Sequence, residues 1–153
     1  MEMILKKVIL ETHLEVYESV SELPENIQDL MNKAQQARKK AYAPYSLFKV
    51  GAAILLDNGS IVTGNNQENA AFPSGLCAER VAAFYAGAEF PGIPFKALAI
   101  SAGSTKSINT QPIPPCGACR QVLSEFTPDL EVLVSNSDGS NTQIIHLAKL
   151  LPN

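Results

Sequence analysis

The hydrophobic positions between residues 48 and 63 predict a buried β-hairpin. Phe48–Leu56 is apolar at most positions, which favours a central strand that is covered on both faces. The turn residues 57–60, Asp-Asn-Gly-Ser, follow at once, and Ile61–Thr63 begins the return strand. The next residues, 64–69, are polar and rich in amides, so we expect them to form a loop.

Three segments have the apolar spacing or the boundary residues of helices. Pro24 opens the first helix, whose apolar stripe should lie against the sheet and which must end before Pro44. The second helix starts near residues 73–75, Pro-Ser-Gly, and ends by Pro91. The third covers Cys116–Phe126. The last two helices should therefore carry cysteines in their first turns.

The second half of the chain alternates between strands and helices. Phe95–Ser101 and Leu130–Val134 are predicted strands, and residues 144–151 form a final short element. Such alternation is typical of an α/β layered sandwich, which we take as the fold class.

The N-terminal residues alternate with the period of a strand. From Leu10 to Tyr17 every second side chain falls on one face, where Leu10, Thr12, Leu14 and Val16 lie. This pattern predicts a half-buried strand at a sheet edge. Residues 1–23 are thus expected to be an N-terminal extension, and residues 24–153 a single domain.

Composition and charge narrow the functional classes. A chain of 153 residues with 46% hydrophobic content suits one globular domain with a sizeable core. The net charge of −3 and the lack of a basic block argue against nucleic-acid binding. No apolar run approaches the roughly 20 residues that span a bilayer, and no signal-peptide pattern is present. We therefore expect a cytoplasmic protein without a membrane partner.

The three cysteines indicate metal chemistry. Cys116 and Cys119 are three residues apart, which places both sulfurs on one helix face, and Cys77 begins the Cys-Ala-Glu-Arg run of the other helix. Helix N-termini favour the thiolates that a metal requires. Three protein ligands and one open position are the arrangement of a catalytic zinc site. Glu79 would lie beside that position, where it could accept a proton from water.

Each cysteine motif also carries an arginine, and the cysteines have other interpretations besides catalytic zinc. Arg80 or Arg120 could offset the charge of three thiolates by hydrogen-bonding the sulfurs. A Cys-x-x-C at a helix start also fits a thiol–disulfide oxidoreductase, and buried cysteines are often ordinary core residues. A structural zinc would need a fourth ligand, for which His146 is the one histidine downstream of the motifs.

The two cysteine motifs together resemble the signature of the zinc-dependent deaminases, whose three-cysteine variant pairs such ligands with a non-ligand glutamate. The pairing of Cys-Ala-Glu-Arg with Pro-Cys-Gly-Ala-Cys-Arg-Gln is similar to that of the small homotetrameric cytidine deaminases. The likeness extends from about Tyr42 to Leu151 and includes the Pro-Tyr-Ser run at 44–46 and the Asn-Gln-Glu-Asn run at 66–69.

This resemblance implies a fold and a ligand set. The fold would be a three-layer α/β/α sandwich with a mixed central sheet of about five strands, plus the extra N-terminal strand. Cys77, Cys116 and Cys119 match the ligands of one Zn²⁺ per subunit, and Glu79 matches the proton shuttle. The remaining matches are substrate-binding positions: Asn66 and Glu68 for the ribose hydroxyls, Phe48 for the pyrimidine ring, Ala78 for a backbone contact with the base, and Ala70 and Phe72 for the site of a neighbouring subunit.

The resemblance also implies an activity. It is the hydrolytic deamination of cytidine or 2′-deoxycytidine in pyrimidine salvage, by a zinc-activated water and a homotetramer whose subunits complete one another's sites. A deaminase of a nucleoside analogue such as blasticidin S shares the zinc site, but Asn66 and Glu68 favour free ribose hydroxyls. A deoxycytidylate or nucleic-acid deaminase would have a histidine in place of Cys77. From another class, a thiol–disulfide oxidoreductase would use Cys116 and Cys119 alone.

Two departures from the family pattern carry expectations of their own. Phe72 stands where a tyrosine is usual, so a hydroxyl contact near the 5′ end of the sugar is expected to be lost. The sequence ends after Leu-Leu-Pro, where family members often continue to an aromatic residue near the active site. We expect this difference to affect closure of the pocket.

Overall fold

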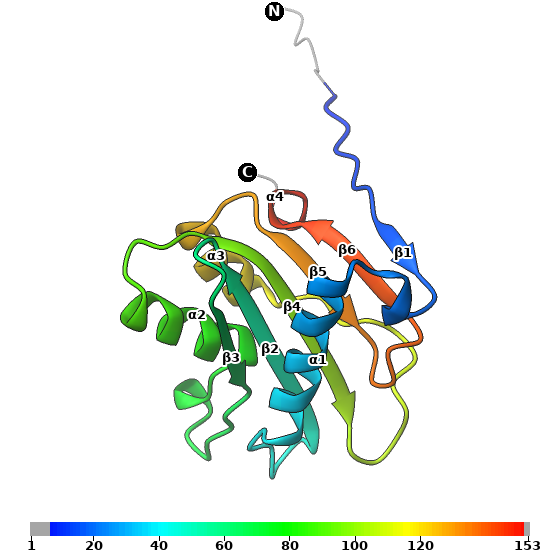
Figure 1. Ribbon diagram of the computed structural model, residues 1–153. Helices are drawn as coiled ribbons and strands as arrows, with labels where there is room; N and C mark the ends of the chain where they lie inside the picture. The colour runs from blue at the N-terminus through cyan, green and yellow to red at the C-terminus, as the bar shows by residue number, and fades with distance from the viewer. Residues whose placement is uncertain (1–6, 152–153) are drawn as a thin grey trace, which may run out of the picture.

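Six strands form one mixed sheet in the computed structural model, which describes residues 7–151 (Figure 1). Their order across the sheet is β1-β6-β5-β4-β2-β3. Neighbouring strands are antiparallel except for β4 and β5, which are parallel. The mixed sheet with an added N-terminal strand is therefore confirmed. The strands are β1 (Glu15–Tyr17), β2 (Phe48–Leu56), β3 (Ile61–Asn65), β4 (Phe95–Ser104), β5 (Glu131–Ser135) and β6 (Thr142–His146).

Helices cover both faces of this sheet, which confirms the three-layer α/β/α arrangement (Figure 1). Helix α1 (Glu25–Lys39) lies on one face, and α2 (Ala78–Glu89) and α3 (Gly117–Phe126) lie on the other. A single turn, α4 (Leu147–Leu150), follows β6, and the 3₁₀ turns are η1 (Val20–Glu22) and η2 (Phe72–Ser74). Within residues 7–151, no helix is both long and apolar enough to cross a membrane.

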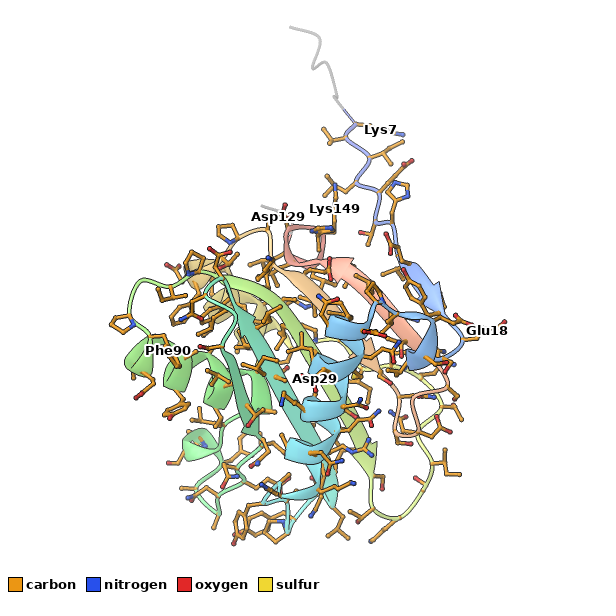
Figure 2. All side chains as sticks on the ribbon, viewed as in Figure 1. Lys7, Glu18, Asp29, Phe90, Asp129 and Lys149 are labelled. Atoms are coloured by element: carbon orange, nitrogen blue, oxygen red, sulfur yellow. The ribbon has the colours of Figure 1, made fainter. Side chains whose placement is uncertain are left out.

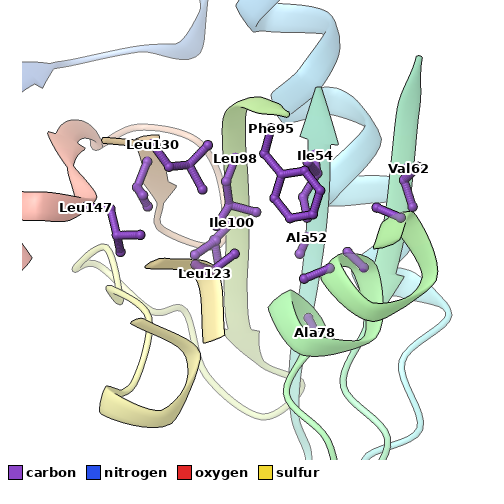
Figure 3. Packing of buried hydrophobic residues seen from close by; sticks show 14 of the residues in the cluster. Ala52, Ile54, Val62, Ala78, Phe95, Leu98, Ile100, Leu123, Leu130 and Leu147 are labelled. Carbon is purple, nitrogen blue, oxygen red and sulfur yellow. The ribbon is translucent and has the colours of Figure 1, made fainter. Parts of the chain in front are cut away.

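Strand β2 is apolar along its length because it is covered on both sides. Ile54 belongs to the core cluster beneath α2 and α3, together with Leu98 and Leu123 (Figure 3). The adjacent residue, Ala53, belongs to the cluster beneath α1, together with Leu30. Successive side chains of a strand point to opposite faces, so a strand between two helical layers needs apolar residues at both sets of positions.

Gly64 of β3 brings α2 close to the sheet. A Cβ atom at Gly64 would lie 2.5 Å from the backbone nitrogen of Ala82 and 2.6 Å from the carbonyl oxygen of Ala78. Real Cβ atoms do not approach backbone atoms so closely. The first turns of α2 can therefore rest on the hairpin only because this position has no side chain.

The predicted N-terminal strand is shorter than its sequence pattern indicates. Only Glu15–Tyr17 pairs with β6, although the edge position is confirmed. Leu10, Leu14 and Val16, predicted to lie on the buried face, are at least half exposed, whereas Tyr17 packs against the α1 cluster. Pairing stops at Glu15, opposite Ile144, and β6 itself ends soon after, at His146, so that residues 10–12 have no partner strand opposite them. Figure 2 shows the chain between Glu18 and Lys7 leading away from the sheet.

Three other boundaries differ from those predicted. Strand β3 continues to Asn65, so the polar loop begins at Asn66, because the pairing with β2 extends as far as Gly51 opposite Asn65. Strand β4 continues to Ser104, which pairs with Phe48 at the start of β2. The second predicted helix is divided into η2 and α2, with the extended Gly75 between them.

Candidate metal centre and its pocket

The three cysteine sulfurs come together where the N-termini of α2 and α3 meet. Cys77 and Cys116 are the N-cap residues of these helices rather than first-turn residues, and Cys119 lies in the first turn of α3. The Sγ atom of Cys116 lies 3.9 Å from that of Cys77 and 3.5 Å from that of Cys119. All three sulfurs are within 4.8 Å of one another, and all three thiols are free.

This spacing fits a tetrahedral zinc ion. Zinc–sulfur bonds of about 2.3 Å place two sulfurs of a tetrahedral site about 3.8 Å apart. The measured separations of 3.5 and 3.9 Å bracket that value. Among residues 7–151, the cysteine trio is the one group of three or more potential metal ligands that lie this close together. The residues present thus supply three ligands and leave the fourth position to a ligand from outside the chain.

The surroundings of Cys77 favour its thiolate. The hydrogen bond with the Cys119 thiol, followed by that from Arg80, lowers the pKa of Cys77 to about 5, against the opposing effect of burial. The guanidinium Nη2 of Arg80 lies 3.8 Å from the sulfur. The pKa of Cys119 is raised, because it shares a proton with Cys77 and is buried. The metal-free cluster therefore already carries negative charge at neutral pH, as a cation site requires.

Arg120, the other arginine predicted to hydrogen-bond the sulfurs, has different partners. Its Nε donates to the carbonyl oxygen of Pro115 at 2.8 Å, and its Nη1 donates to that of Leu150 at 2.8 Å. Of the two arginines, Arg80 is thus the one that contacts a sulfur. Arg120 instead joins the segment before Cys116 to the end of α4.

Glu79 lies beside the thiols in the first turn of α2. It is 5% exposed and lines the same pocket as Cys77 and Cys116. Burial is the main factor that raises the pKa of Glu79, and the nearby charge of Cys77 raises it further. A carboxyl group with an elevated pKa, next to an open metal position, is suited to accept and return protons near neutral pH.

The pocket above the thiols has a volume of about 760 Å³. Its floor is formed by Cys77, Cys116 and Glu79, and β2 and β4 contribute the apolar residues Val50 and Ile100. The polar segment after β3 forms part of its wall through four consecutive residues, Asn66, Gln67, Glu68 and Asn69. The pocket is large enough for a nucleoside-sized molecule.

Asn66 and Glu68 both line the pocket, and both already have partners in the protein. The Oδ1 of Asn66 accepts from the backbone nitrogen of Val50 at 2.8 Å, and its Nδ2 donates to the carbonyl oxygen of Phe48 at 2.9 Å. The carboxylate of Glu68 accepts from the Tyr45 backbone nitrogen at 2.9 Å. Hydrogen bonds with Ser46 and Tyr45 lower the pKa of Glu68. Both side chains are thereby held in fixed orientations.

The other residues implied by the resemblance differ in their distance from the pocket. Ala70 and Phe72 line it, and the Phe72 side chain is 90% exposed at its rim. Phe48, at the start of β2, is half-buried and is absent from the pocket lining. Ala78, the first residue of α2, is fully buried and is absent from the pocket lining.

Sequence reasoning missed several residues that the fold brings to the pocket. Tyr45 and Ser46 line it from the loop before β2, and Ile113 and Pro114 line it from the segment before Cys116. The Pro-Tyr-Ser run was visible in the sequence, but nothing in its spacing relates it to Glu68, which lies more than 20 residues further on. The contact arises because Tyr42 and Glu68 are joined by a backbone hydrogen bond of 2.9 Å.

His146 does not join the thiol cluster. It is exposed at the end of β6, where its Nδ1 lies 3.2 Å from Asp129. The group that could hold a metal consists of the three cysteines alone. This argues against a structural site closed by His146. A thiol–disulfide role for Cys116 and Cys119 would leave the adjacent Cys77 and the buried Glu79 without a purpose.

Comparison with known proteins gives consistent relatives. The family model for the "cytidine and deoxycytidylate deaminase zinc-binding region" matches residues 24–135. A cytidine deaminase from Halalkalibacterium halodurans is 44% identical over 126 residues, which cover 82% of this chain and 90% of that protein. One from Sporosarcina psychrophila is 42% identical over 129 residues, which cover 83% of this chain and 89% of that protein.

Solved structures agree with these sequence relatives. The crystal structure of cytidine deaminase from Burkholderia pseudomallei superposes with a TM-score of 0.74 at 43% identity, covering 82% of this chain and 95% of that one. The structure of the Mycobacterium leprae cytidine deaminase gives a TM-score of 0.67 at 34% identity, covering 85% of this chain and all of that one. These structures therefore share the fold of most of this chain.

Proposed function

Because the chain belongs to the cytidine and deoxycytidylate deaminase family, we propose that it hydrolyses cytidine, 2′-deoxycytidine or both to the uridine nucleoside and ammonia. The observation that carries this proposal is a cluster of three free thiols, two of which line a pocket together with one buried carboxyl group. Three thiolate ligands with an open position suit a catalytic zinc ion. The carboxyl group supplies the acid–base function that deamination requires.

Cys77, Cys116 and Cys119 would hold one zinc ion. When bound there, zinc would lower the pKa of a water molecule to about 7, and so supply a nucleophile at neutral pH. Arg80 donates to the Cys77 sulfur and thereby reduces the negative charge of the thiolates.

Glu79 moves the protons of the reaction. Its carboxylate takes a proton from the attacking water and delivers one to ring nitrogen N3, while the new C–O bond forms at C4. It then takes the proton of the new C4 hydroxyl and transfers it to the amino group, so that the C4–N bond breaks, ammonia leaves and the C4 carbonyl forms. Burial raises the pKa of Glu79 above its ordinary value, which favours a carboxyl group that donates protons as well as accepting them.

We assign the sugar to the wall formed by Asn66 and Glu68. Asn66 uses one amide hydrogen on the Phe48 carbonyl, and its NH₂ group has a second to offer a hydroxyl. The hydrogen bond from Ser46 lowers the pKa of Glu68 and so favours its ionised form, which can accept from a hydroxyl. The base would lie deeper, between the Glu79 carboxyl group and the backbone of Ala78. Phe48 would need to turn toward the pocket to contact the pyrimidine ring.

A homotetramer whose subunits complete one another's pockets is also part of the proposal. Its support is the exposure of large apolar side chains at and near the pocket rim, where Phe72 is 90% exposed and Tyr45 61%. Such residues are commonly covered by a partner. Light scattering coupled to gel filtration would measure the mass, and a monomer that turns over cytidine at the full rate would contradict this arrangement.

The division of the chain into an extension and a catalytic domain remains a proposal. We assign residues 24–153 to the catalytic domain and residues 1–23 to the extension, of which residues 1–6, like residues 152 and 153, lie outside the described part. In support, the family model begins at residue 24, and β1 adds only three residues to the sheet edge. Residues 9–13 form one wall of a separate cavity of about 710 Å³ against α4. A cytoplasmic location is proposed on the three free thiols, which persist in a reducing compartment.

Ammonia release from cytidine tests the proposed function directly. Purified, zinc-loaded protein would be supplied in parallel with cytidine, 2′-deoxycytidine, cytidine 5′-monophosphate and blasticidin S. We expect turnover of one or both nucleosides and little of the nucleotide, because the described pocket lining has one basic side chain, Arg80, and that side chain is engaged with Cys77. Turnover of blasticidin S alone would favour the analogue deaminase, and no turnover with zinc bound would refute the proposal.

A further inference from the structure

The carboxylate of Glu68 is fixed from two directions. The backbone nitrogen of Glu68 donates to the carbonyl oxygen of Tyr42 at 2.9 Å, which sets the position of the residue. Its Oε2 accepts from the backbone nitrogens of Tyr45 at 2.9 Å and Ser46 at 3.3 Å. Its Oε1 accepts from the Ser46 hydroxyl. Residues 45 and 46 therefore hold both oxygens of a carboxylate that lines the pocket.

The Ser46 hydroxyl has a defined direction. Its oxygen accepts a hydrogen bond from the backbone nitrogen of Phe48 at 3.0 Å. Because that bond occupies the lone pair on one side, the hydroxyl hydrogen is left to point at Glu68. The hydrogen bond from the Ser46 hydroxyl to Glu68 is the largest cause of the lowered pKa of Glu68.

The backbone between Ser46 and Phe48 is held in an uncommon conformation. Leu47 has a φ of 56°, in the left-handed region that non-glycine residues rarely occupy. Its nitrogen donates to the carbonyl oxygen of Ala43 at 3.1 Å, and its carbonyl oxygen accepts from the Thr105 nitrogen at 2.9 Å and the Thr105 hydroxyl at 3.2 Å. Such a conformation persists only where its surroundings impose it. Here it lets one hydroxyl bridge Phe48 and Glu68.

The bonds from this loop leave part of the carboxylate available. A carboxylate offers about four acceptor positions, and Tyr45 and Ser46 fill three of them. The fourth is on Oε1, the oxygen that the Ser46 hydroxyl contacts. Since Glu68 lines the pocket, a ligand hydroxyl can use that position.

We propose that Ser46 is a positioning residue for the substrate: its hydroxyl orients the Glu68 carboxylate so that Oε1 accepts a hydrogen bond from one ribose hydroxyl. This inference rests on the proposed function, because it concerns how the nucleoside is held. Ser46 itself takes no part in proton transfer. Its removal should therefore affect KM and leave kcat nearly unchanged.

Kinetics with three nucleosides test this role in the zinc-loaded enzyme. KM and kcat of Ser46→Ala and of the parent would be measured with cytidine, 2′-deoxycytidine and 3′-deoxycytidine. For cytidine we expect KM to rise about five- to ten-fold, because a hydrogen bond to a charged group is lost at a partly exposed position. For the deoxy analogue that lacks the hydroxyl bound by Glu68, KM should be the same in both proteins.

Two further variants separate positioning from folding. Ser46→Thr keeps the hydroxyl and should restore the KM for cytidine. Ser104→Ala is the matched control, because the Ser104 hydroxyl accepts from the backbone nitrogen two residues on, at Lys106, without contacting Glu68. The KM and kcat of this control variant should equal those of the parent. Melting temperatures of all variants would be recorded alongside.

The possible outcomes are distinct. A KM that rises equally for all three nucleosides means that Ser46→Ala disturbs the loop as a whole, and this overturns the assignment. So does a kcat effect without a KM effect, or no effect at all. Absence of turnover by the zinc-loaded parent refutes the proposed function itself, and the role of Ser46 with it.

Discussion

Replacing Gly64 with alanine tests how closely α2 must approach the sheet. The added Cβ would lie 2.5 Å from the Ala82 nitrogen, 2.6 Å from the Ala78 oxygen and 3.0 Å from the Ala82 Cα. To reach even 3.0 Å from the first of these atoms, α2 must retreat by about 0.5 Å. All three contacts are with helix backbone, which cannot rotate aside. The helix that carries Glu79 and is capped by Cys77 would have to move as a unit.

The cost can be estimated from this overlap. Overpacking a well-filled interior destabilises a protein by about 1–3 kcal/mol, and a clash with backbone belongs in the upper part of that range, at about 2–3 kcal/mol. For a chain of this size each kcal/mol lowers the melting temperature by about 2–4 °C. We therefore expect Gly64→Ala to lower it by about 4–12 °C. Zinc affinity should fall as well, because the Cys77 sulfur moves relative to those of α3.

Gly117→Ala is the matched control for this substitution. Gly117 follows Cys116 at the first position of α3, and a Cβ there meets nothing within 4 Å. Alanine suits a helix better than glycine, so this variant should be as stable as the parent or more stable by up to about 1 kcal/mol. Thermal unfolding followed by circular dichroism gives the melting temperatures, and competition with a chromophoric chelator gives the zinc affinities. If Gly64→Ala melted and bound zinc like Gly117→Ala, the close approach of α2 would be disproved.

Three other substitutions probe the metal centre. Glu79→Gln should retain zinc and the fold but lower kcat by about 10²–10⁴-fold, as loss of an acid–base residue does, and near-full activity would contradict the proton-transfer role. Of the hydrogen bonds from Cys119 and Arg80 that lower the pKa of Cys77 to about 5, Arg80→Ala removes the second. In metal-free protein the alkylation of Cys77 should then begin at higher pH, as peptide mass spectrometry would measure. His146→Ala should bind zinc at the parental stoichiometry, and metal analysis showing a loss would reinstate a fourth protein ligand.

The central hairpin was predictable because its determinants are local. The apolar run Phe48–Leu56 gives the bounds of β2 correctly, since both of its faces are covered and its turn residues follow directly. Gly59 adopts a φ of 85° there, as the turn pattern requires. The fold class follows similarly from the alternation of strands and helices. The N-terminal strand was predicted at the sheet edge, where it lies, but its length was overestimated, because alternation shows which side chains share a face and not whether a partner strand continues beside them.

The reactive residues of the site could be predicted from the sequence, but most of the residues that hold them in place could not. Helix spacing relates Cys116 to Cys119, whereas Cys77 was grouped with them as a third ligand by its residue type, its place at a helix start and the resemblance to deaminases, because the contact itself depends on how two helices pack. No periodicity relates Ser46 to Glu68 or Arg120 to the Leu150 carbonyl. Such contacts are made between loops and chain segments that come together only when the sheet has formed.

The hydrogen bonds of Arg120 have a practical consequence for handling the protein. They connect the Leu150 carbonyl to the carbonyl of Pro115, whose next neighbour is Cys116. A force or steric load applied after α4 is thus transmitted to the thiol cluster. The segment between Glu18 and Lys7 leads away from the sheet (Figure 2), and its hydrogen bond with α4, from the Thr12 hydroxyl to the Lys149 carbonyl oxygen, is long at 3.5 Å compared with the 2.8 Å bonds of Arg120. An affinity handle, a fluorophore or a surface tether should accordingly be attached at the beginning of the chain.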